Sequence, residues 1–180
     1  MPGSKDLLTT TSFHMEVSTV TVLETAKKMI DYSHGNLHDI NHFMKVYAYA
    51  KMIADGEQLD PDTQKLVEMT ALVHDIACPL CRVKYGNTNG KNQEKESAAL
   101  IAEFFKDSNL PQDFTDRISF LVSHHHTLDQ IDGIDYQIII EADYLVNADE
   151  SHFSGHNIKN MYDKIFKTET GKFLLRSMYQ

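Results

Sequence analysis

The hydrophobic positions follow a helical period along almost the entire chain. Apolar side chains recur every three or four residues in successive segments, which is the pattern of helices that bury one face. The isoleucine run at 138–140 has the composition of a short buried strand, but the helical spacing continues through Ala142 and Leu145. We therefore predict an all-α fold. The predicted helices cover residues 16–31, 40–53, 60–75, 98–105, 114–122, 138–146 and 158–166.

Glycine, proline and asparagine mark where these helices begin and end. Asp60 is a capping residue for the third helix, and the proline that follows it suits a first turn. Pro79 prevents that helix from extending much further, and residues 82–92 form a predicted loop rich in glycine and asparagine. Neither an internal repeat nor a domain linker is visible. We expect a flexible lead-in at 1–12 and a single helical domain at 13–180.

The net charge and the lengths of the apolar runs indicate which kinds of binding partner to expect. The 180 residues are 42% hydrophobic and carry a formal net charge of −9. This acidity argues against a broad nucleic-acid surface, although a bound divalent cation reverses the local sign and permits a phosphate ligand. No apolar run reaches the roughly 18 residues of a membrane span, and no signal peptide is recognisable. We expect a cytoplasmic protein with no nucleic-acid or membrane partner; a homodimer is compatible with the sequence.

Cys78 and Cys81 have the spacing of a dithiol redox motif. That chemistry usually lies between a strand and a helix, and no strand is predicted before this pair. Two cysteines also supply only half of a structural zinc site, and the chain contains no others. We interpret them as semi-buried residues near a helix end.

His74 and Asp75 are adjacent at the end of an apolar helix, while His42 and Asp143 lie within two other predicted helices. A His-Asp pair alone is weak, because chance supplies about one in a chain of this composition. Asp143, however, has apolar residues on both sides, where a carboxylate is costly unless it is paired or binds a cation. Two imidazoles and two carboxylates suit Mn, Fe, Ni, Co, Zn or Mg rather than a thiophilic metal.

The order and context of these four residues resemble the HD-domain family of metal-dependent phosphohydrolases. The matching motifs are H-x-x-K-V from His42, A-L-V-H-D-I around His74 and Asp75, and E-A-D-Y-L-V-N around Asp143. The resemblance covers about residues 36–150. It implies a helical bundle with a central metal site whose ligands are His42, His74, Asp75 and Asp143.

Members of that family with two metals have additional histidines, one before the fourth core helix and others near the fifth. This chain has His124, His125 and His126 at the later position, but Gln93 followed by Glu94 at the earlier one. Consecutive helical residues point about 100° apart, so we expect His125 or His126 to face the metal and His124 to face solvent. Three roles stay open for Glu94: an oxygen ligand in place of the missing histidine, or a general base or an orienting residue in a one-metal site. We expect one tightly bound divalent metal, and leave a second open.

The resemblance implies hydrolysis of a phosphoester by a metal-activated water. The expected substrate is a nucleotide or another small phosphorylated metabolite. Two alternatives stay open: a di-iron oxygenase of the HD type, and a non-catalytic nucleotide-binding regulatory module. The residues expected to take part in catalysis are Asp75, Glu94, His125 and His126, and those expected to contact the substrate are Lys45, Arg82 and Lys84.

Overall fold

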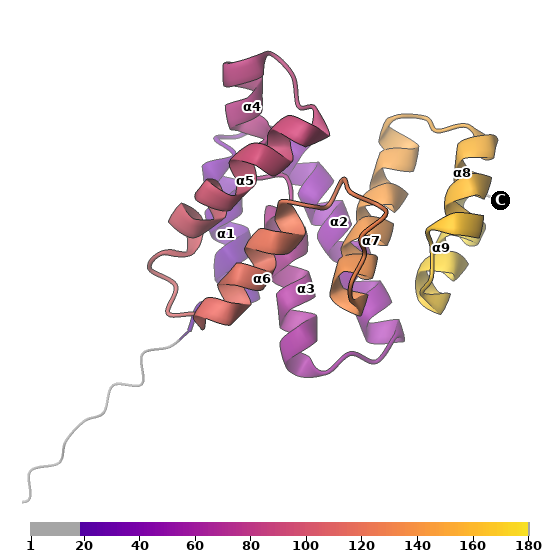
Figure 1. Cartoon of the computed structure of the whole chain (residues 1–180), viewed down its shortest axis with the longest axis horizontal. Coiled ribbons are helices and arrows are strands. Elements are labelled where there is room, and N and C mark those ends of the chain that lie inside the picture. The colour runs from indigo at the N-terminus through magenta and orange to yellow at the C-terminus, as the bar shows by residue number, and fades with distance from the viewer. Residues whose placement is uncertain (1–18, 180) are drawn as a thin grey trace, which may run out of the picture.

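A computed structural model describes residues 19–179 of the chain. Over this range it forms nine helices and no strand, which confirms the predicted all-α class. Figure 1 shows α1 to α7 as one bundle, with α8 and α9 beside α7. The helices are α1 (Val22–Tyr32), α2 (Leu37–Gly56), α3 (Pro61–Val73), α4 (Cys78–Tyr85), α5 (Gly90–Phe105), α6 (Gln112–Val122), α7 (Ile134–Glu150), α8 (Gly155–Lys164) and α9 (Glu169–Tyr179).

Helices α2, α3 and α7 form the centre of the bundle and pack against one another. Each contributes to two groups of buried apolar side chains, one towards α8 and α9 and the other towards α1, α5 and α6. On α2, for example, Val46 belongs to the first group and Phe43 to the second. The predicted ligands thus lie on α2 and α7 and directly after α3, at the centre of the bundle. None of the described helices combines the length and hydropathy that a membrane span requires.

The predicted loop at 82–92 is wrong at both ends. Helix α4 continues to Tyr85 and α5 begins at Gly90, so that only residues 86–89 connect them. Pro79 lies in the first turn of α4, where the missing N–H of proline costs nothing because first-turn amides have no intrahelical partner. Pro79 therefore begins a new helix after the turn at 74–77.

Both ends of the described chain also differ from the prediction. Helix α1 begins at Val22, and Thr21 and Glu24 form a reciprocal capping box that fixes this start; predicted positions 16–18 lie outside the described residues. Helix α9 was not predicted. It is tied to α7 because the buried Glu141 accepts hydrogen bonds from the backbone N–H groups of Lys167 (2.6 Å) and Thr168 (3.1 Å).

Candidate metal centre

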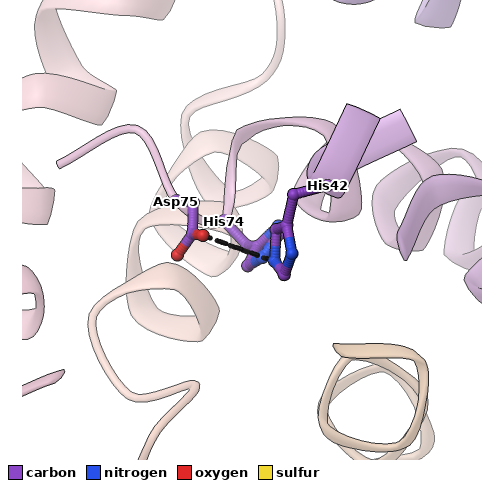
Figure 2. Close-up of side chains that lie close together, drawn as sticks. All are labelled: His42, His74 and Asp75. Carbon is purple, nitrogen blue, oxygen red and sulfur yellow. Dashed lines mark hydrogen bonds and ion pairs between the residues drawn. The ribbon is translucent and has the colours of Figure 1, made fainter. Parts of the chain in front are cut away.

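The four residues predicted as ligands meet at one point of the bundle. His42 comes from α2, His74 and Asp75 from the turn after α3, and Asp143 from α7. Nε2 of His42 lies 3.2 Å from Nε2 of His74, 3.4 Å from Oδ2 of Asp75 and 3.3 Å from Oδ1 of Asp143. Nε2 of His74 lies 3.6 Å and 3.5 Å from the same two oxygens. Figure 2 shows the two imidazoles and Asp75 turned towards one another.

The turn after α3 explains how two adjacent residues reach one site. Helix α3 ends at Val73, and the chain tightens as Ile76 N–H donates to Val73 O and Cys78 N–H donates to Asp75 O. Successive side chains of a continuing helix would diverge, whereas this turn presents His74 and Asp75 together. His74 is fully buried, which fits the apolar sequence before it.

Hydrogen bonds fix the tautomer of the histidines. Nδ1 of His74 lies 2.8 Å from the carbonyl oxygen of Ala71, and Nδ1 of His42 lies 2.8 Å from Oε2 of Glu150. Carbonyl and carboxylate oxygens only accept, so Nδ1 carries the proton in each ring. Each Nε2 therefore directs a lone pair at the other across 3.2 Å. Such a contact is repulsive unless a proton or a metal ion lies between the rings.

The spacing of these donor atoms fits a divalent metal. A cation held at about 2.1 Å separates neighbouring ligand atoms by about 3.0 Å in an octahedron and about 3.4 Å in a tetrahedron. Five of the six separations among Nε2 of His42, Nε2 of His74, Oδ2 of Asp75 and Oδ1 of Asp143 fall between 3.2 and 3.6 Å. Ligand atoms of His42, His74 and Asp75 all lie within 4.8 Å of one another, and Asp143 approaches the two imidazoles from α7. A mixed nitrogen and oxygen set matches the borderline transition metals.

The electrostatics of this cluster favour a positive charge at its centre. Burial alone would lower the pKa of His42, but the hydrogen bond with Asp143 and the charge of Asp75 raise it to about 9. Burial alone would raise the pKa of Asp143, yet hydrogen bonds from His42 and His74 hold it well below its ordinary value. The pKa of Asp75 is lowered as well, because the nearby charges of His74 and His125 outweigh its burial.

A second group of donor atoms lies on the other side of Asp75. Ligand atoms of Asp75, His125 and His126 lie within 4.8 Å of one another, and Nε2 of His125 is 3.6 Å from Oδ1 of Asp75. Nδ1 of His125 lies 2.7 Å from the carbonyl oxygen of Val122, which leaves Nε2 free to bind. The structure thus brings both predicted histidines to Asp75, whose two oxygens face different imidazoles.

Gln93 stands beside this second group, where two-metal members of the resembled family have a histidine. Its side chain is buried and lines the same pocket, and its Nε2 donates to the carbonyl oxygen of Thr88 at 3.0 Å. Its Oε1 and Nε2 of His125 are buried side-chain atoms without a hydrogen-bond partner among the described residues. Unpaired buried acceptors are uncommon. An amide oxygen is a hard ligand, so each of these two atoms is chemically able to bind a cation.

The other predicted site residues lie in different places. Arg82 lines the pocket, and its guanidinium donates to both carboxylate oxygens of Asp39 at 2.6 Å. The Lys84 ammonium instead donates to Glu96 at 2.8 Å and does not line the pocket. Glu94 is also absent from the lining, and its Oε1 accepts from the Thr127 hydroxyl at 2.9 Å.

Two further predicted residues lie against other side chains. The Lys45 ammonium donates to Oε1 of Glu150 at 2.9 Å. His124 is half-buried and stacks on Phe120 rather than facing solvent, with 4.4 Å between ring centroids. The expectation of a solvent-facing His124 is therefore wrong, although His124 is absent from the lining of the pocket.

Sequence reasoning missed Glu150. It lies seven residues after Asp143, which is about two turns along α7 and therefore on the same face. The helical spacing was a usable signal. Its partner, however, is 108 residues away in the sequence, and no local pattern specifies that contact.

The site opens into a pocket of about 330 Å³ whose lining is almost entirely polar. Cys78 is the least polar residue of this lining. Burial and the nearby charge of Asp75 raise the pKa of its thiol. A protonated thiol of this kind is a poor redox nucleophile. A larger groove of about 530 Å³ lies between α3 and α6, but its lining contains no histidine or cysteine. The lining of the smaller pocket is His38, Asp39, His42, Asp75, Cys78, Arg82, Thr88, Gln93, His126, Asp143, Asn147, Glu150 and Ser151.

Comparisons with known proteins agree with this geometry. The sequence profile of the HD domain matches residues 39–149. Solved structures with the same fold include a predicted HD superfamily hydrolase from an uncultured Thermotogales bacterium, with a TM-score of 0.60, 20% identity, and coverage of 88% of this chain and 83% of the other. They also include Bacillus subtilis YpgQ in complex with ADP, with a TM-score of 0.58, 19% identity, and coverage of 89% and 90%. No curated protein matches the chain.

Proposed function

The chain belongs to the HD domain family, and from this premise we propose that it is a metal-dependent phosphohydrolase acting on a nucleotide or another small phosphorylated metabolite. The observation that carries the proposal is that Nε2 of His42 and Nε2 of His74 lie 3.2 Å apart, and that each lies 3.3–3.6 Å from an oxygen of Asp75 and from an oxygen of Asp143. The fold is that of HD superfamily hydrolases. We retain the cytoplasm as the proposed compartment.

A divalent cation bound by His42, His74, Asp75 and Asp143 would lower the pKa of a bound water and polarise a phosphoryl oxygen. The protein supplies the surroundings for this chemistry. The Arg82 guanidinium, oriented by Asp39, faces the pocket where a phosphate would lie. His126 lines the pocket and its side chain still reaches solvent. Desolvation and the nearby charge of His125 lower its pKa to about 4, so its imidazole is neutral at pH 7 and can offer a nitrogen to a cation.

The charge of the pocket supports a second, weaker cation beside Asp75. Four carboxylates line it, those of Asp39, Asp75, Asp143 and Glu150, against one guanidinium, that of Arg82. Such a lining repels a phosphate dianion until cations reverse the local sign. We therefore propose that cations are needed to bind the substrate as well as to cleave it, with the tighter ion between His42 and Asp143 and the weaker one at Asp75, His125 and His126.

The polar lining indicates which part of the substrate is recognised. No aliphatic, phenyl or phenol side chain is among the pocket residues, so the phosphate and hydroxyl groups of a ligand have more partners than a nucleobase. The related fold of YpgQ was solved with ADP, which supports a nucleotide. Nucleotides and sugar phosphates therefore both belong in the substrate assay.

The test is phosphate release by purified protein that has been stripped with a chelator and reloaded with Mn, Co, Ni, Fe(II), Zn or Mg. The panel contains nucleoside mono-, di- and triphosphates and sugar phosphates. We expect turnover only after reloading, and loss of turnover to the metal-free level in His74→Gln. The matched control is His156→Gln, because His156 is exposed and outside the pocket.

Two results would contradict the proposal, and a third would invalidate the comparison of variants. Metal-dependent binding of a phosphate ligand without turnover would indicate the regulatory module. Two irons per chain with consumption of O₂ would indicate the oxygenase. Equal loss of turnover in the His156→Gln control would show that the His74→Gln result does not report on the metal site.

A further inference from the structure

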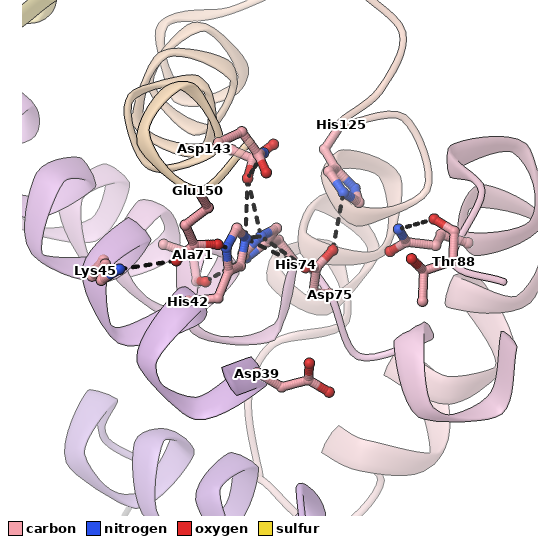
Figure 3. Close-up of polar contacts among 12 residues, drawn as sticks. Asp39, His42, Lys45, Ala71, His74, Asp75, Thr88, His125, Asp143 and Glu150 are labelled. Atoms are coloured by element: carbon pink, nitrogen blue, oxygen red, sulfur yellow. Dashed lines mark hydrogen bonds and ion pairs between the residues drawn. The ribbon is translucent and has the colours of Figure 1, made fainter. Parts of the chain in front are cut away.

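A chain of polar contacts runs from the candidate metal site to the surface of α2. Oε2 of Glu150 lies 2.8 Å from Nδ1 of His42, and Oε1 of Glu150 lies 2.9 Å from the ammonium of Lys45. Figure 3 shows Glu150 between these two residues, with Asp143 approaching His42 separately from the same helix. The side chain of Glu150 is 18% exposed, compared with 47% for Lys45, so the contact chain becomes progressively more buried towards the metal site.

Glu150 and Asp143 contact different nitrogens of the His42 imidazole. Nε2 of His42 faces Asp75 at 3.4 Å and Asp143 at 3.3 Å, whereas Nδ1 faces Glu150. A carboxylate that accepts the Nδ1 proton fixes the tautomer, orients the ring and raises the basicity of the other nitrogen. These are the properties that a metal-binding imidazole needs.

His42 differs in this respect from His74 and His125. The Nδ1 atoms of those two rings lie 2.8 and 2.7 Å from backbone carbonyl oxygens three residues earlier in the chain. Their orientation is a consequence of the local backbone. The orientation of His42 depends instead on a side chain from another helix, and its partner carries a full negative charge.

Lys45 has no place in the lining of the pocket. It lies three residues after His42 on α2, on the same side of that helix, and its ammonium meets the oxygen of Glu150 that His42 leaves free. Lys45 therefore restrains the Glu150 carboxylate and offsets its charge, and the predicted contact between Lys45 and substrate is replaced by this role.

We propose that Glu150 is a positioning residue that prepares His42 for metal binding, and that Lys45 holds Glu150 in that position. This inference rests on the metal site of the proposed function, although not on the reaction. Removing Glu150 should weaken metal binding even if the substrate is never identified.

The experiment compares metal affinity among single variants of the full chain. Mn²⁺ binding to chelator-stripped protein is measured by calorimetry, and the visible spectrum of the Co²⁺-loaded protein reports the ligand geometry. We expect Glu150→Gln to weaken binding about 10- to 100-fold, as observed for other partners of metal-bound histidines, and to shift the Co²⁺ bands at saturation. Lys45→Met should weaken binding by a smaller factor.

The matched control is Lys51→Met. Lys51 lies on the same helix, pairs with Glu68 at 2.8 Å and is 42% exposed, but is remote from the pocket. It should leave both the affinity and the spectrum unchanged. Circular dichroism of the metal-free variants verifies folding, and Lys45→Met provides the test if Glu150→Gln fails to fold, because Lys45 is nearly half exposed.

Wild-type affinity and spectrum in Glu150→Gln would overturn the inference, as would equal losses in Lys45→Met and Lys51→Met. Failure of the proposed function is a separate result. A wild-type protein that binds metal through the Glu150-dependent site but hydrolyses no phosphoester would support this inference and contradict the hydrolase. A wild-type protein that binds no metal would contradict both.

Discussion

Asp75 connects the two groups of donor atoms at the scale of single residues. Its Oδ2 lies 3.4 Å from Nε2 of His42 and 3.6 Å from Nε2 of His74, while its Oδ1 lies 3.6 Å from Nε2 of His125. A carboxylate with two oxygens can face two cations at once, which neither an imidazole nor a backbone carbonyl can do as readily. The residue that follows His74 therefore has to be acidic for both positions to exist.

This geometry predicts different metal contents for two substitutions. Asp75→Asn should reduce the bound metal at both positions, because the neutral amide is a weaker ligand with only one oxygen. His125→Asn should retain the tight ion and lose only the weaker one. The measurement is metal per chain after equilibrium dialysis at increasing Mn²⁺ concentrations. Retention of the tight ion by Asp75→Asn, or its loss from His125→Asn, would contradict the assignment.

Capping and turn residues determine where the site-bearing helices begin and end at the scale of elements. Helix α3 begins at Pro61, and the Asp60 carboxylate accepts from the backbone N–H groups of Asp62 and Thr63, each at 3.1 Å. These bonds satisfy two amides that have no partner within the helix. The cap therefore fixes where α3 begins, and the turn that carries His74 and Asp75 follows its last residue, Val73.

Asp60→Ala should lower the free energy of unfolding by about 1 kcal/mol, the usual cost of losing a side-chain cap. Urea denaturation of the metal-free protein measures it. The control is Asp129→Ala, at an exposed loop position, which should change stability by less than about 0.5 kcal/mol. Equal effects of the two substitutions would show that the cap contributes nothing specific.

Glu141 joins the C-terminal helices to the centre of the bundle at the scale of the whole molecule. Besides two backbone amides, it accepts from Nε2 of Gln137 at 2.7 Å and from the hydroxyl of Thr168. A side chain at Gly171 would collide with this carboxylate, so glycine is required where α9 approaches. Since Asp143 lies two residues further along α7, the same contact that holds α9 also steadies the helix that carries a candidate ligand.

Burial raises the pKa of Glu141, even though hydrogen bonds from Thr168 and Lys167 partly oppose the shift. Between the ordinary value of 4.5 and the raised value, the folded state binds more protons than the unfolded state. The contribution of Glu141 to stability is therefore fully present below pH 4.5 and is lost as the pH rises through the raised value. Glu141→Gln should remove this dependence.

The measurement is urea denaturation of the metal-free wild type and Glu141→Gln from pH 4 to 8. The neutral glutamine also loses acceptor capacity and lowers stability by a constant amount, so the informative quantity is the difference in slope against pH. The wild type should lose stability relative to the variant as the pH increases. Parallel curves, or a difference of the opposite sign, would contradict the assignment.

Much of the site was predictable because its signals are local. The helical period identified α2, α3 and α7, and the apolar residues around His74 and Asp143 showed that polar side chains emerge there from a buried environment. The resemblance of the three motifs then placed His42 with them. By contrast, the amphipathic period gave no warning that Pro79 starts a helix, because proline ends one helix and begins another with equal ease.

The sequence by itself determined the all-α class, because helical periodicity is a property of neighbouring positions. It also determined the four candidate ligands, because the three motifs that resemble the HD-domain family are each local. Only the tertiary structure decided which residues support them. Glu150 follows its partners His42 and Lys45 by 108 and 105 residues in the sequence. Thr168, which precedes α9, lies 27 residues after its partner Glu141. Such contacts depend on how separate helices pack, and that packing is a property of the whole chain rather than of any one segment.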